Sequence, residues 1–509
     1  MKLWALLFSI IFSSCTKNNL DLEESSNLSL IFTGNVNAEI EPCGCRQFPL
    51  GGIDNVYGAL SSEKKSSSVL FVDTGDSYYQ ASFIPESEEE STKEKARSVH
   101  LGFNLVDLKL KLIGDQDLSS GFDDLKELIK DSKYEILVSN LNKPDFPHIE
   151  YKTYTFHQHR LFFLGVVNPE TIQASYRSFF SEPEASIKRM INNLTNTEKF
   201  DSKNPYHHLI VLSHSGQKLE NQYANTFEAI DWILGSHSMN FTQKPNVIKK
   251  TRLAQMLSRN HYLGKISFIK DDPKTTYSTI EINQQLANKV KNNPLISFIE
   301  ERKKITDKIL VTEQSKNSEE FYNTDQIPTA SACIDCHDAQ GTFWQKTSHS
   351  LAYITLKNST RHHDLDCLKC HSLGTRDKKG YVDSKKIVIV EKQEDYWKEV
   401  FSKAAPSISL RELAESEIHQ HSKAWYDLDL KYNVSHNYAN VQCLNCHQQN
   451  IEHLNNPSAH KGKNVEKIKN ACLSCHTSDQ STHWYSNNKL IEETFQKMYV
   501  KMSCPKITD

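Results

Sequence analysis

The chain has 509 residues, of which 38% are hydrophobic and 24% are charged. This length exceeds that of one ordinary domain, and the hydrophobic fraction excludes a disordered or fibrous protein. The 60 basic and 63 acidic residues nearly balance, so we expect no nucleic-acid partner.

The first fifteen residues have the pattern of an export signal. Lys2 precedes an apolar run over residues 3–12, and two serines then lead to Cys15. A cysteine at this point resembles the lipidation site of a bacterial lipoprotein. The resemblance implies a signal peptide over residues 1–15, a lipid on Cys15 and a membrane-anchored protein facing the periplasm or the cell exterior. The alternatives are an uncleaved anchor and secretion with an unmodified Cys15. The polar residues 16–27 are expected to form a tether.

Residues 28–270 alternate apolar runs with helical patterns, which predicts a layered α/β domain. Helices are expected over Asp123–Lys130 and Pro183–Leu194. Polar clusters follow several of the apolar runs, and open α/β sheets place their sites at the carboxyl ends of strands. The predicted strands are Leu28–Thr33, Val69–Asp73, Ile136–Ser139, Leu161–Val167, Leu209–Ser213 and Ile230–Gly235.

A helical and polar linker is expected over residues 271–328. It would contain a long helix from Gln284 to Leu310 with a kink at Pro294. Strand patterns fade over residues 329–485, and eight of the twelve cysteines form four pairs there. Residues 486–509 are expected to be a C-terminal tail.

The four cysteine pairs share the spacing CxxCH, which attaches c-type haem. Two thiols one helical turn apart reach the two vinyl groups of a porphyrin, and the next histidine ligates its iron. Two Cys₄ zinc sites are the alternative, although zinc does not require a histidine after each pair. Because four porphyrins would fill much of this domain, we expect few side chains in its core and no folding without haem. The attachment residues are Cys333, Cys336, Cys367, Cys370, Cys443, Cys446, Cys472 and Cys475, and the proximal ligands are His337, His371, His447 and His476.

The first and third motifs carry a resemblance to the cytochrome c-554 family. Cys333–His337 is followed by Trp344 and by a Ser-x-His-type element containing His349. Cys443–His447 is followed by His453, which resembles a later element of that family. The resemblance implies a mostly helical, haem-packed domain that exchanges electrons with a redox partner protein or a small-molecule donor or acceptor. The distal ligands that it implies are His349 and His453, with His363 or His362 and His436 as further candidates.

Residues 28–270 resemble the calcineurin-like metallophosphoesterases, specifically the periplasmic 5′-nucleotidases. The family's motifs occur in the family's order, with substitutions in several of them. The corresponding segments are Asn35-Val36-Asn37, Gly75-Asp76, Gly114-Asp115-Gln116-Asp117, Ser213-His214-Ser215-Gly216 and Ser236-His237-Ser238-Met239.

The substitutions imply that one of the family's two metal positions is lost. Its ligands here would be Asn35, Asn37, Asp76 and Met239, and neutral amides and a thioether are poor ligands for a hard divalent ion. Gln116 replaces the histidine that assists the leaving oxygen. We therefore expect no two-metal hydrolysis. The second position would be either a single divalent metal site or a hydrogen-bonded remnant, formed by Asp76, Asp115, His214 and His237.

Three cysteines lie outside the four pairs and the export signal. Cys43 and Cys45 belong to a segment that resembles an insertion of exported phosphoesterase-like proteins that accompany haem domains. Their thiolates would either favour a softer metal ion at the lost position or form a disulfide. Cys504 is an unassigned thiol near the end of the chain.

These features predict an exported protein that transfers electrons through four haems, with the N-terminal domain as a docking or sensing scaffold. One alternative is a haem enzyme that acts on a small nitrogen or sulfur compound at an open iron. The other is a metal-dependent phosphoesterase. An iron accessible to small ligands would indicate the first, and phosphatase activity with manganese or zinc would indicate the second.

Overall fold

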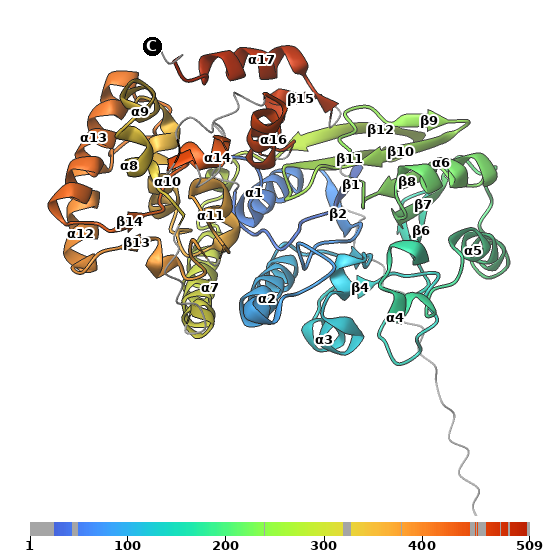
Figure 1. Ribbon diagram of the computed structural model, residues 1–509. Helices are drawn as coiled ribbons and strands as arrows, with labels where there is room; N and C mark the ends of the chain where they lie inside the picture. The colour runs from blue at the N-terminus through green and yellow to red at the C-terminus, as the bar shows by residue number, and fades with distance from the viewer. Residues whose placement is uncertain are drawn as a thin grey trace, which may run out of the picture.

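The computed structural model describes residues 25–42, 49–238, 240–318, 327–377, 379–447, 453–454, 456, 465–478, 480–486 and 489–505. The predicted export signal and four of the residues named above (Cys15, Cys43, Cys45 and Met239) lie outside this part. Figure 1 shows two sheets with their helices on the right and a mostly helical region on the left. The predicted combination of an α/β part and a mostly helical part is therefore confirmed. In the described part, no helix is both long enough and apolar enough to cross a bilayer.

The first sheet has the strand order β12-β11-β1-β2-β3-β4. Strands β1 to β4 are parallel to one another, whereas β11 and β12 add an antiparallel hairpin beside β1. The strand bounds are β1 Asn27–Thr33, β2 Ser68–Asp73, β3 Leu110–Lys111, β4 Glu135–Ile136, β11 Tyr262–Ile269 and β12 Asp272–Glu281.

The second sheet has the order β5-β6-β7-β8-β10-β9. Its four central strands are parallel, and the two edge strands are antiparallel to their neighbours. The bounds are β5 Tyr151–Phe156, β6 His159–Val167, β7 His207–His214, β8 Trp232–Gly235, β9 Asn246–Ile248 and β10 Thr251–Gln255.

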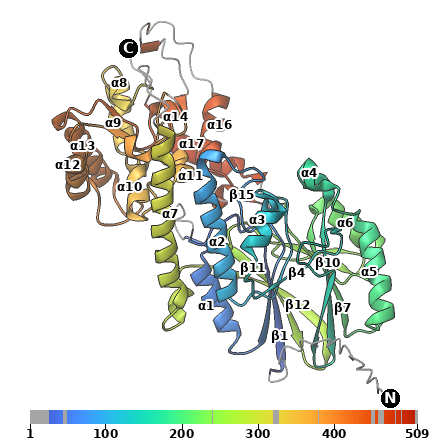
Figure 2. The same cartoon turned by 90° about the horizontal axis from the view of Figure 1, so that it is seen from below.

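The two sheets pack face to face between two layers of helices. In β6, Leu161 and Phe163 point into the core between the sheets, while Phe162 and Leu164 face α5 (Pro183–Thr197) and α6 (Gln217–Thr226). Successive side chains of a strand point to opposite faces, so a strand covered on both sides is a continuous apolar run. The other outer face is covered by α1 (Ile53–Glu63), α2 (Glu89–Leu105) and α7 (Pro294–Ser318), as Figure 2 shows.

The predicted strand Ile136–Ser139 is shorter than expected. β4 ends at Ile136, and Ser139 donates its backbone N–H to the Gly165 carbonyl of the second sheet at 2.6 Å. The chain therefore leaves one sheet and joins the other within three residues. Helix α3 (Gly121–Leu128) begins and ends two residues before the predicted bounds.

The region expected to be a linker is part of the folded structure. β12 completes the first sheet, and α7 packs Leu295 and Ile299 into the N-terminal core. The predicted kink is wrong because Pro294 is the first residue of α7. Proline is favoured at a helix start, where no backbone N–H is needed.

The C-terminal part contains nine described helices of its own. Five of them, α10 to α14, contribute side chains to a core that includes Leu351, Tyr396 and Trp425. The expectation of few side chains in this core is therefore wrong: aromatic and aliphatic residues fill it. The helices are α8 Ala330–Ile334, α9 Asp338–Gln345, α10 Ala352–Asn358, α11 Leu365–His371, α12 Gln393–Glu399, α13 Glu415–Lys431, α14 Cys443–His447, α16 Val465–Cys475 and α17 Glu492–Lys501.

The predicted tail also contains regular structure. Helix α17 buries Phe495, whose ring packs against Trp484 with the centroids 5.8 Å apart. The predicted C-terminal tail thus contains a helix, and its Phe495 packs on the Trp484 ring that stacks on His476 of the fourth motif.

Candidate metal site and cysteine motifs

Four candidate ligands meet between the two sheets at the carboxyl ends of their strands. Asp76 and Asp115 follow β2 and β3 of the first sheet, while His214 ends β7 and His237 follows β8 of the second. One donor atom from each lies within 4.8 Å of the others. Two carboxylates and two imidazoles suit a divalent transition metal. Among the described residues, this is the single group of at least three such donors.

His214 links the two carboxylates. Its Nε2 lies 3.1 Å from Asp76 Oδ2 and 3.0 Å from Asp115 Oδ1. His237 approaches from the opposite side, with Nδ1 3.0 Å from the same Asp115 oxygen. Asp115 therefore lies at the centre of the cluster.

A hydrogen bond behind His214 fixes its tautomer. The Ser236 hydroxyl donates to the Thr74 carbonyl, so its oxygen accepts from His214 Nδ1 at 2.6 Å. Nδ1 therefore carries a proton, and Nε2 points at the two carboxylates. That arrangement is repulsive unless a second proton or a cation lies between them. Ser236 was not predicted, because its role depends on contacts between separate strands.

The electrostatics of the cluster favour a cation. Burial opposes ionisation of Asp115, yet hydrogen bonds from His214 and His237 hold its pKa well below the usual range. Burial alone would lower the pKa of His214, but Asp76 and Asp115 raise it well above the ordinary value. Burial raises the pKa of Asp76. A protonated His214 therefore balances the two carboxylates, and a divalent metal ion bound by the cluster would take over that positive charge.

The backbone around the cluster is held in a left-handed conformation. Asp76 has φ 55° and His237 has φ 69°, values that non-glycine residues rarely adopt. Asp117 supports this conformation by accepting backbone N–H groups from residues 76, 77, 78 and 114 at 2.9 to 3.0 Å. Lys111 neutralises Asp117 at 3.0 Å. Neither supporting side chain was predicted as part of the site.

The residues of the expected lost position lie beside the cluster. Asn35 is 3% exposed, its Oδ1 accepts from the His237 backbone N–H at 3.1 Å, and its Nδ2 has no hydrogen-bond partner among the described residues. Asn37 donates its backbone N–H to the Asp76 carbonyl at 3.0 Å. The backbone N–H of Gln116 donates to Asp76 Oδ1 at 2.9 Å. None of the three adds an anionic ligand to the four donors.

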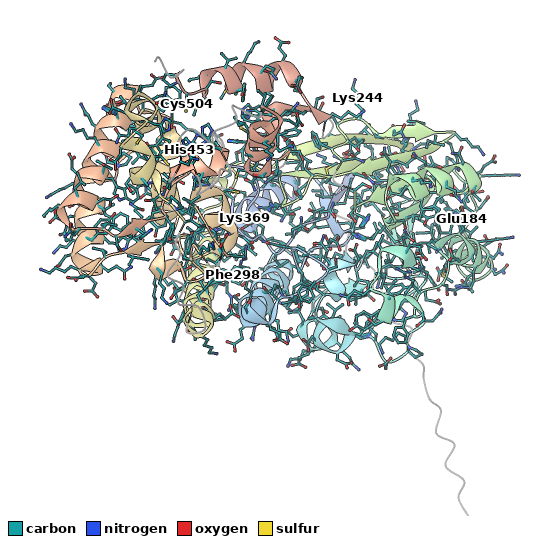
Figure 3. The ribbon with its side chains drawn as sticks, in the orientation of Figure 1. Glu184, Lys244, Phe298, Lys369, His453 and Cys504 are labelled. Carbon is teal, nitrogen blue, oxygen red and sulfur yellow. The ribbon has the colours of Figure 1, made fainter. Side chains whose placement is uncertain are left out.

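The four cysteine motifs gather in pairs that are distant in sequence. The thiols of Cys333 and Cys443 lie close enough to affect each other's ionisation, which brings the first motif next to the third. The thiols of Cys370 and Cys475 are likewise neighbours, which brings the second motif next to the fourth. Helix α14 also packs on α8 and α16. Figure 3 places the labelled His453 and Cys504 in this same region.

Two predicted distal ligands face proximal histidines of other motifs. The ring centroids of His337 and His453 are 6.0 Å apart, and those of His349 and His476 are 6.3 Å apart. An iron about 2 Å from one nitrogen of each ring places the centroids roughly 6 Å apart. Both separations therefore leave room for one metal ion between the rings.

Hydrogen bonds orient two of the motif histidines. His371 donates from Nδ1 to the Ala352 carbonyl at 2.7 Å, and a carbonyl only accepts. The proton on Nδ1 leaves the Nε2 lone pair for a metal, which is the usual arrangement of a ligating histidine. His476 Nδ1 lies 2.9 Å from the Ser481 hydroxyl.

The remaining distal candidates differ in their surroundings. Lys357 donates to His362 Nε2 at 3.0 Å, which occupies that lone pair. His363 Nδ1 instead bonds the Ser384 hydroxyl at 2.8 Å. His436 has a buried Nδ1 with no hydrogen-bond partner in the described part of the chain. These contacts favour His363 over His362.

The zinc alternative finds no support in the described part of the chain. The described cysteines of the four motifs form no group of three or more donors at ligand spacing. The Cys504 thiol lies close enough to Cys443 and Cys446 to raise the pKa of both, which places it next to the third motif.

Comparison with known proteins agrees with a two-part chain. Residues 332–394 match the family model described as cytochrome c554 and c-prime. This segment contains the first two motifs together with His349 and His363. The third and fourth motifs lie beyond it.

The N-terminal part is similar to other proteins. Over 264 residues the chain is 21% identical to Protein 5NUC of Lutzomyia longipalpis, an alignment that covers 47% of this chain and 44% of that protein. A 5′-nucleotidase precursor from Thermus thermophilus superposes with a TM-score of 0.46 at 15% identity, covering 55% of this chain and 58% of that one. Calcineurin-like phosphoesterase YfkN from Bacillus subtilis superposes with a TM-score of 0.43 at 16% identity, covering 55% of this chain and 98% of that one.

The chain spans less than half of the curated relative and under two thirds of the Thermus nucleotidase. Both resemblances expected from the sequence recur in these comparisons, and the two parts are joined in one polypeptide.

Proposed function

We propose that this protein transfers electrons through four c-type haems attached at its CxxCH motifs. The observation that carries the proposal is the pairing of histidines: His337 faces His453, and His349 faces His476, at separations that suit one iron between each pair. When bound, a haem iron with two imidazole ligands supplies one-electron exchange without an open position for substrate.

The protein's own residues would prepare these ligands. The Ala352 carbonyl orients the His371 ring, and the Ser481 hydroxyl lies against the His476 ring. Contacts between thiols of different motifs bring the motifs within a short distance, which suits electron exchange between neighbouring haems. Maturation of such haems takes place outside the cytoplasm. We therefore also propose export with a lipid anchor at Cys15, with a redox protein or a small molecule as the electron partner.

Visible and EPR spectra of the ferric holoprotein test this function, with a haem count from mass spectrometry. Four haems with only low-spin signals are expected. A high-spin signal that shifts on adding nitrite, cyanide or sulfite would contradict the carrier function and indicate a haem enzyme with an open iron.

We further propose that the N-terminal cluster holds one divalent metal and does not hydrolyse phosphate esters by a two-metal mechanism. The specific support is the convergence of four donor side chains, in which His214 contacts both Asp76 and Asp115 and one donor atom from each of the four residues lies within 4.8 Å of the others. A single ion lacks the partner that would clamp the second oxygen of an in-line displacement. Metal analysis of the purified protein, together with phosphatase assays in manganese and zinc, tests both parts of the proposal.

A further inference from the structure

The second cysteine motif is fastened to the N-terminal domain on both of its sides. Its helix, α11, is capped by Asp364, which accepts a hydrogen bond from the Asp366 backbone N–H at 2.9 Å. Lys95 of α2 donates to the same carboxylate at 3.2 Å. Beyond the motif, Arg376 donates three hydrogen bonds to Glu88, at 2.8 to 3.0 Å. The N-terminal domain therefore fixes the position of this helix.

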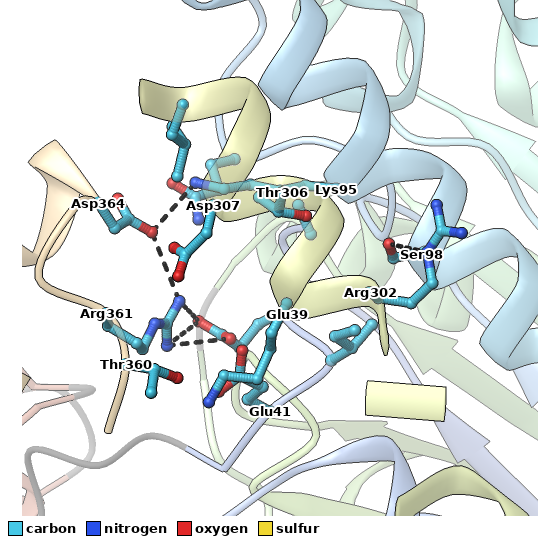
Figure 4. Close-up of a pocket in the computed structure, with 15 residues that line it drawn as sticks. Glu39, Glu41, Lys95, Ser98, Arg302, Thr306, Asp307, Thr360, Arg361 and Asp364 are labelled. Atoms are coloured by element: carbon cyan, nitrogen blue, oxygen red, sulfur yellow. Dashed lines mark hydrogen bonds and ion pairs between the residues drawn. The ribbon is translucent and has the colours of Figure 1, made fainter. Parts of the chain in front are cut away.

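Arg361 lies at the centre of the contact. Its guanidinium donates to the Glu39 carboxylate at 3.2 and 3.4 Å, and it also lies 3.6 Å from Asp364. Figure 4 shows Arg361 between Glu39 and Asp364, with Lys95 bonded to the second carboxylate. A cavity of about 50 Å³ borders these side chains. Charges enclosed in this way are weakly screened by water and act over a longer range than surface charges.

The same charges act on the first cysteine of the motif. Burial raises the pKa of the Cys367 thiol to about 12; Arg361 opposes the rise, and Asp364 and Glu39 add to it. A thioether at Cys367 would attach the porphyrin directly to this position. Reduction changes the charge on the iron by one unit, so that fixed charges near the haem shift its reduction potential.

We propose that Glu39 and Arg361 set the reduction potential of the haem attached to Cys367 and Cys370, so that the N-terminal domain controls one haem of the four. The inference rests on the proposed tetrahaem function. The Glu39 carboxylate favours the oxidised iron and lowers the potential. The Arg361 guanidinium favours the reduced iron and raises it. Both act as positioning charges and not as iron ligands.

Potentiometric titration of the holoprotein, followed by haem absorbance, resolves the reduction waves. Glu39→Gln is expected to raise one wave by a tenfold change in its reduction equilibrium, about 59 mV for one electron. Arg361→Gln is expected to lower the same wave. Glu39→Asp keeps the charge and leaves the wave in place. As a matched control, Glu63→Gln removes the partner of Lys265 elsewhere in the N-terminal domain and moves no wave.

Removal of the attachment site identifies the haem that responds. The double substitution Cys367→Ser and Cys370→Ser is expected to abolish the responding wave, and Glu39→Gln in that background moves none of the others. If Glu39→Gln alone prevents folding, the double variant Glu39→Gln with Arg361→Gln, which removes both members of this ion pair, is compared with Arg361→Gln alone. If the Glu39→Gln protein carries four haems and its reduction waves stay in place, or all move equally, the inference is wrong. A haem count below four in the native protein would contradict the proposed function itself.

Discussion

The Lys111 ammonium lies 2.7 Å from the Asp73 carboxylate, and neither side chain has any exposed surface. Lys111 also neutralises Asp117, whose carboxylate holds the backbone N–H groups that shape the Asp76 loop. The buried ion pair is therefore a structural support directly beneath the candidate metal ligands.

Lys111→Met is expected to destabilise the N-terminal domain by about 3–5 kcal/mol, because it leaves two buried carboxylates without their partner. Urea unfolding followed by far-UV circular dichroism measures the change. Lys109→Met is the control: its partner Asp107 is half exposed, and the loss should stay below about 1 kcal/mol. Equal losses for the two variants would refute the supporting role of Lys111.

His349→Ala and His453→Ala are each expected to convert one haem from low spin to high spin, because each removes one imidazole of a facing pair. EPR spectra of the ferric proteins count the high-spin haems, and the double variant should contain two. His148→Ala in the N-terminal domain should leave the spectrum unchanged. If both single variants stay entirely low spin, the ligand assignment is wrong.

The purified protein should contain about one divalent metal ion per chain. Asp115→Asn neutralises the carboxylate that contacts both His214 and His237, and we expect metal affinity to fall at least tenfold. Ser236→Ala, which frees the His214 tautomer, should weaken binding by about 10–100-fold. Titration calorimetry with manganese or zinc gives these affinities. Asp123→Asn, at an exposed position of α3, should bind as the native protein does.

The metal position that we propose to be lost should be recoverable. Asn35→Asp, Asn37→His and Met239→His together restore anionic and imidazole ligands, and we expect the metal content to rise from one ion to two. Phosphatase activity should appear only when Gln116→His is added, because that histidine would assist the leaving oxygen. Robust phosphatase activity of the native protein would show that the substitutions have not disabled the site.

The potential of one haem should fall as the pH rises through about 6. Burial raises the pKa of Asp307 to about 6, with Lys303 and Arg361 opposing and Asp364 and Glu41 adding to the rise. Deprotonation of Asp307 adds a negative charge to the cavity that Arg361 and Glu39 also line. This charge favours the oxidised iron and therefore lowers its reduction potential. Between pH 3.8, the ordinary pKa of an aspartate, and pH 6, Asp307 keeps its proton in the folded protein but loses it in the unfolded chain. The free energy of unfolding should therefore fall as the pH rises through this range. Asp307→Asn should flatten both dependences, as redox and thermal titrations would show.

Local patterns in the sequence predicted much of the fold. β6 and β7 contain the strands expected from their apolar runs, and α5 begins at the predicted Pro183. Pro294 was misplaced because a proline within an apolar helical pattern fits a kink as well as a helix start. Motif comparison also named all four donors of the candidate metal cluster.

Long-range contacts could not be predicted in this way. His349 and His476 face each other, although they lie near opposite ends of the C-terminal part. Nothing in the sequence around either histidine specifies the other as its partner. The contact of Glu39 with Arg361 likewise depends on how two domains dock. Ser236 was missed because its hydroxyl matters only after β7 and β8 are paired.

The aromatic stack on the fourth motif has a consequence for oxygen. Trp484 stacks on the His476 ring at 4.5 Å, and Phe495 of α17 packs in an edge geometry against Trp484. Both rings are buried, so they cover the His476 ring on the side of Trp484. Dissolved dioxygen could not contact an iron held by His476 from that side, so electrons stored there would be retained for a specific acceptor and would not be lost as superoxide.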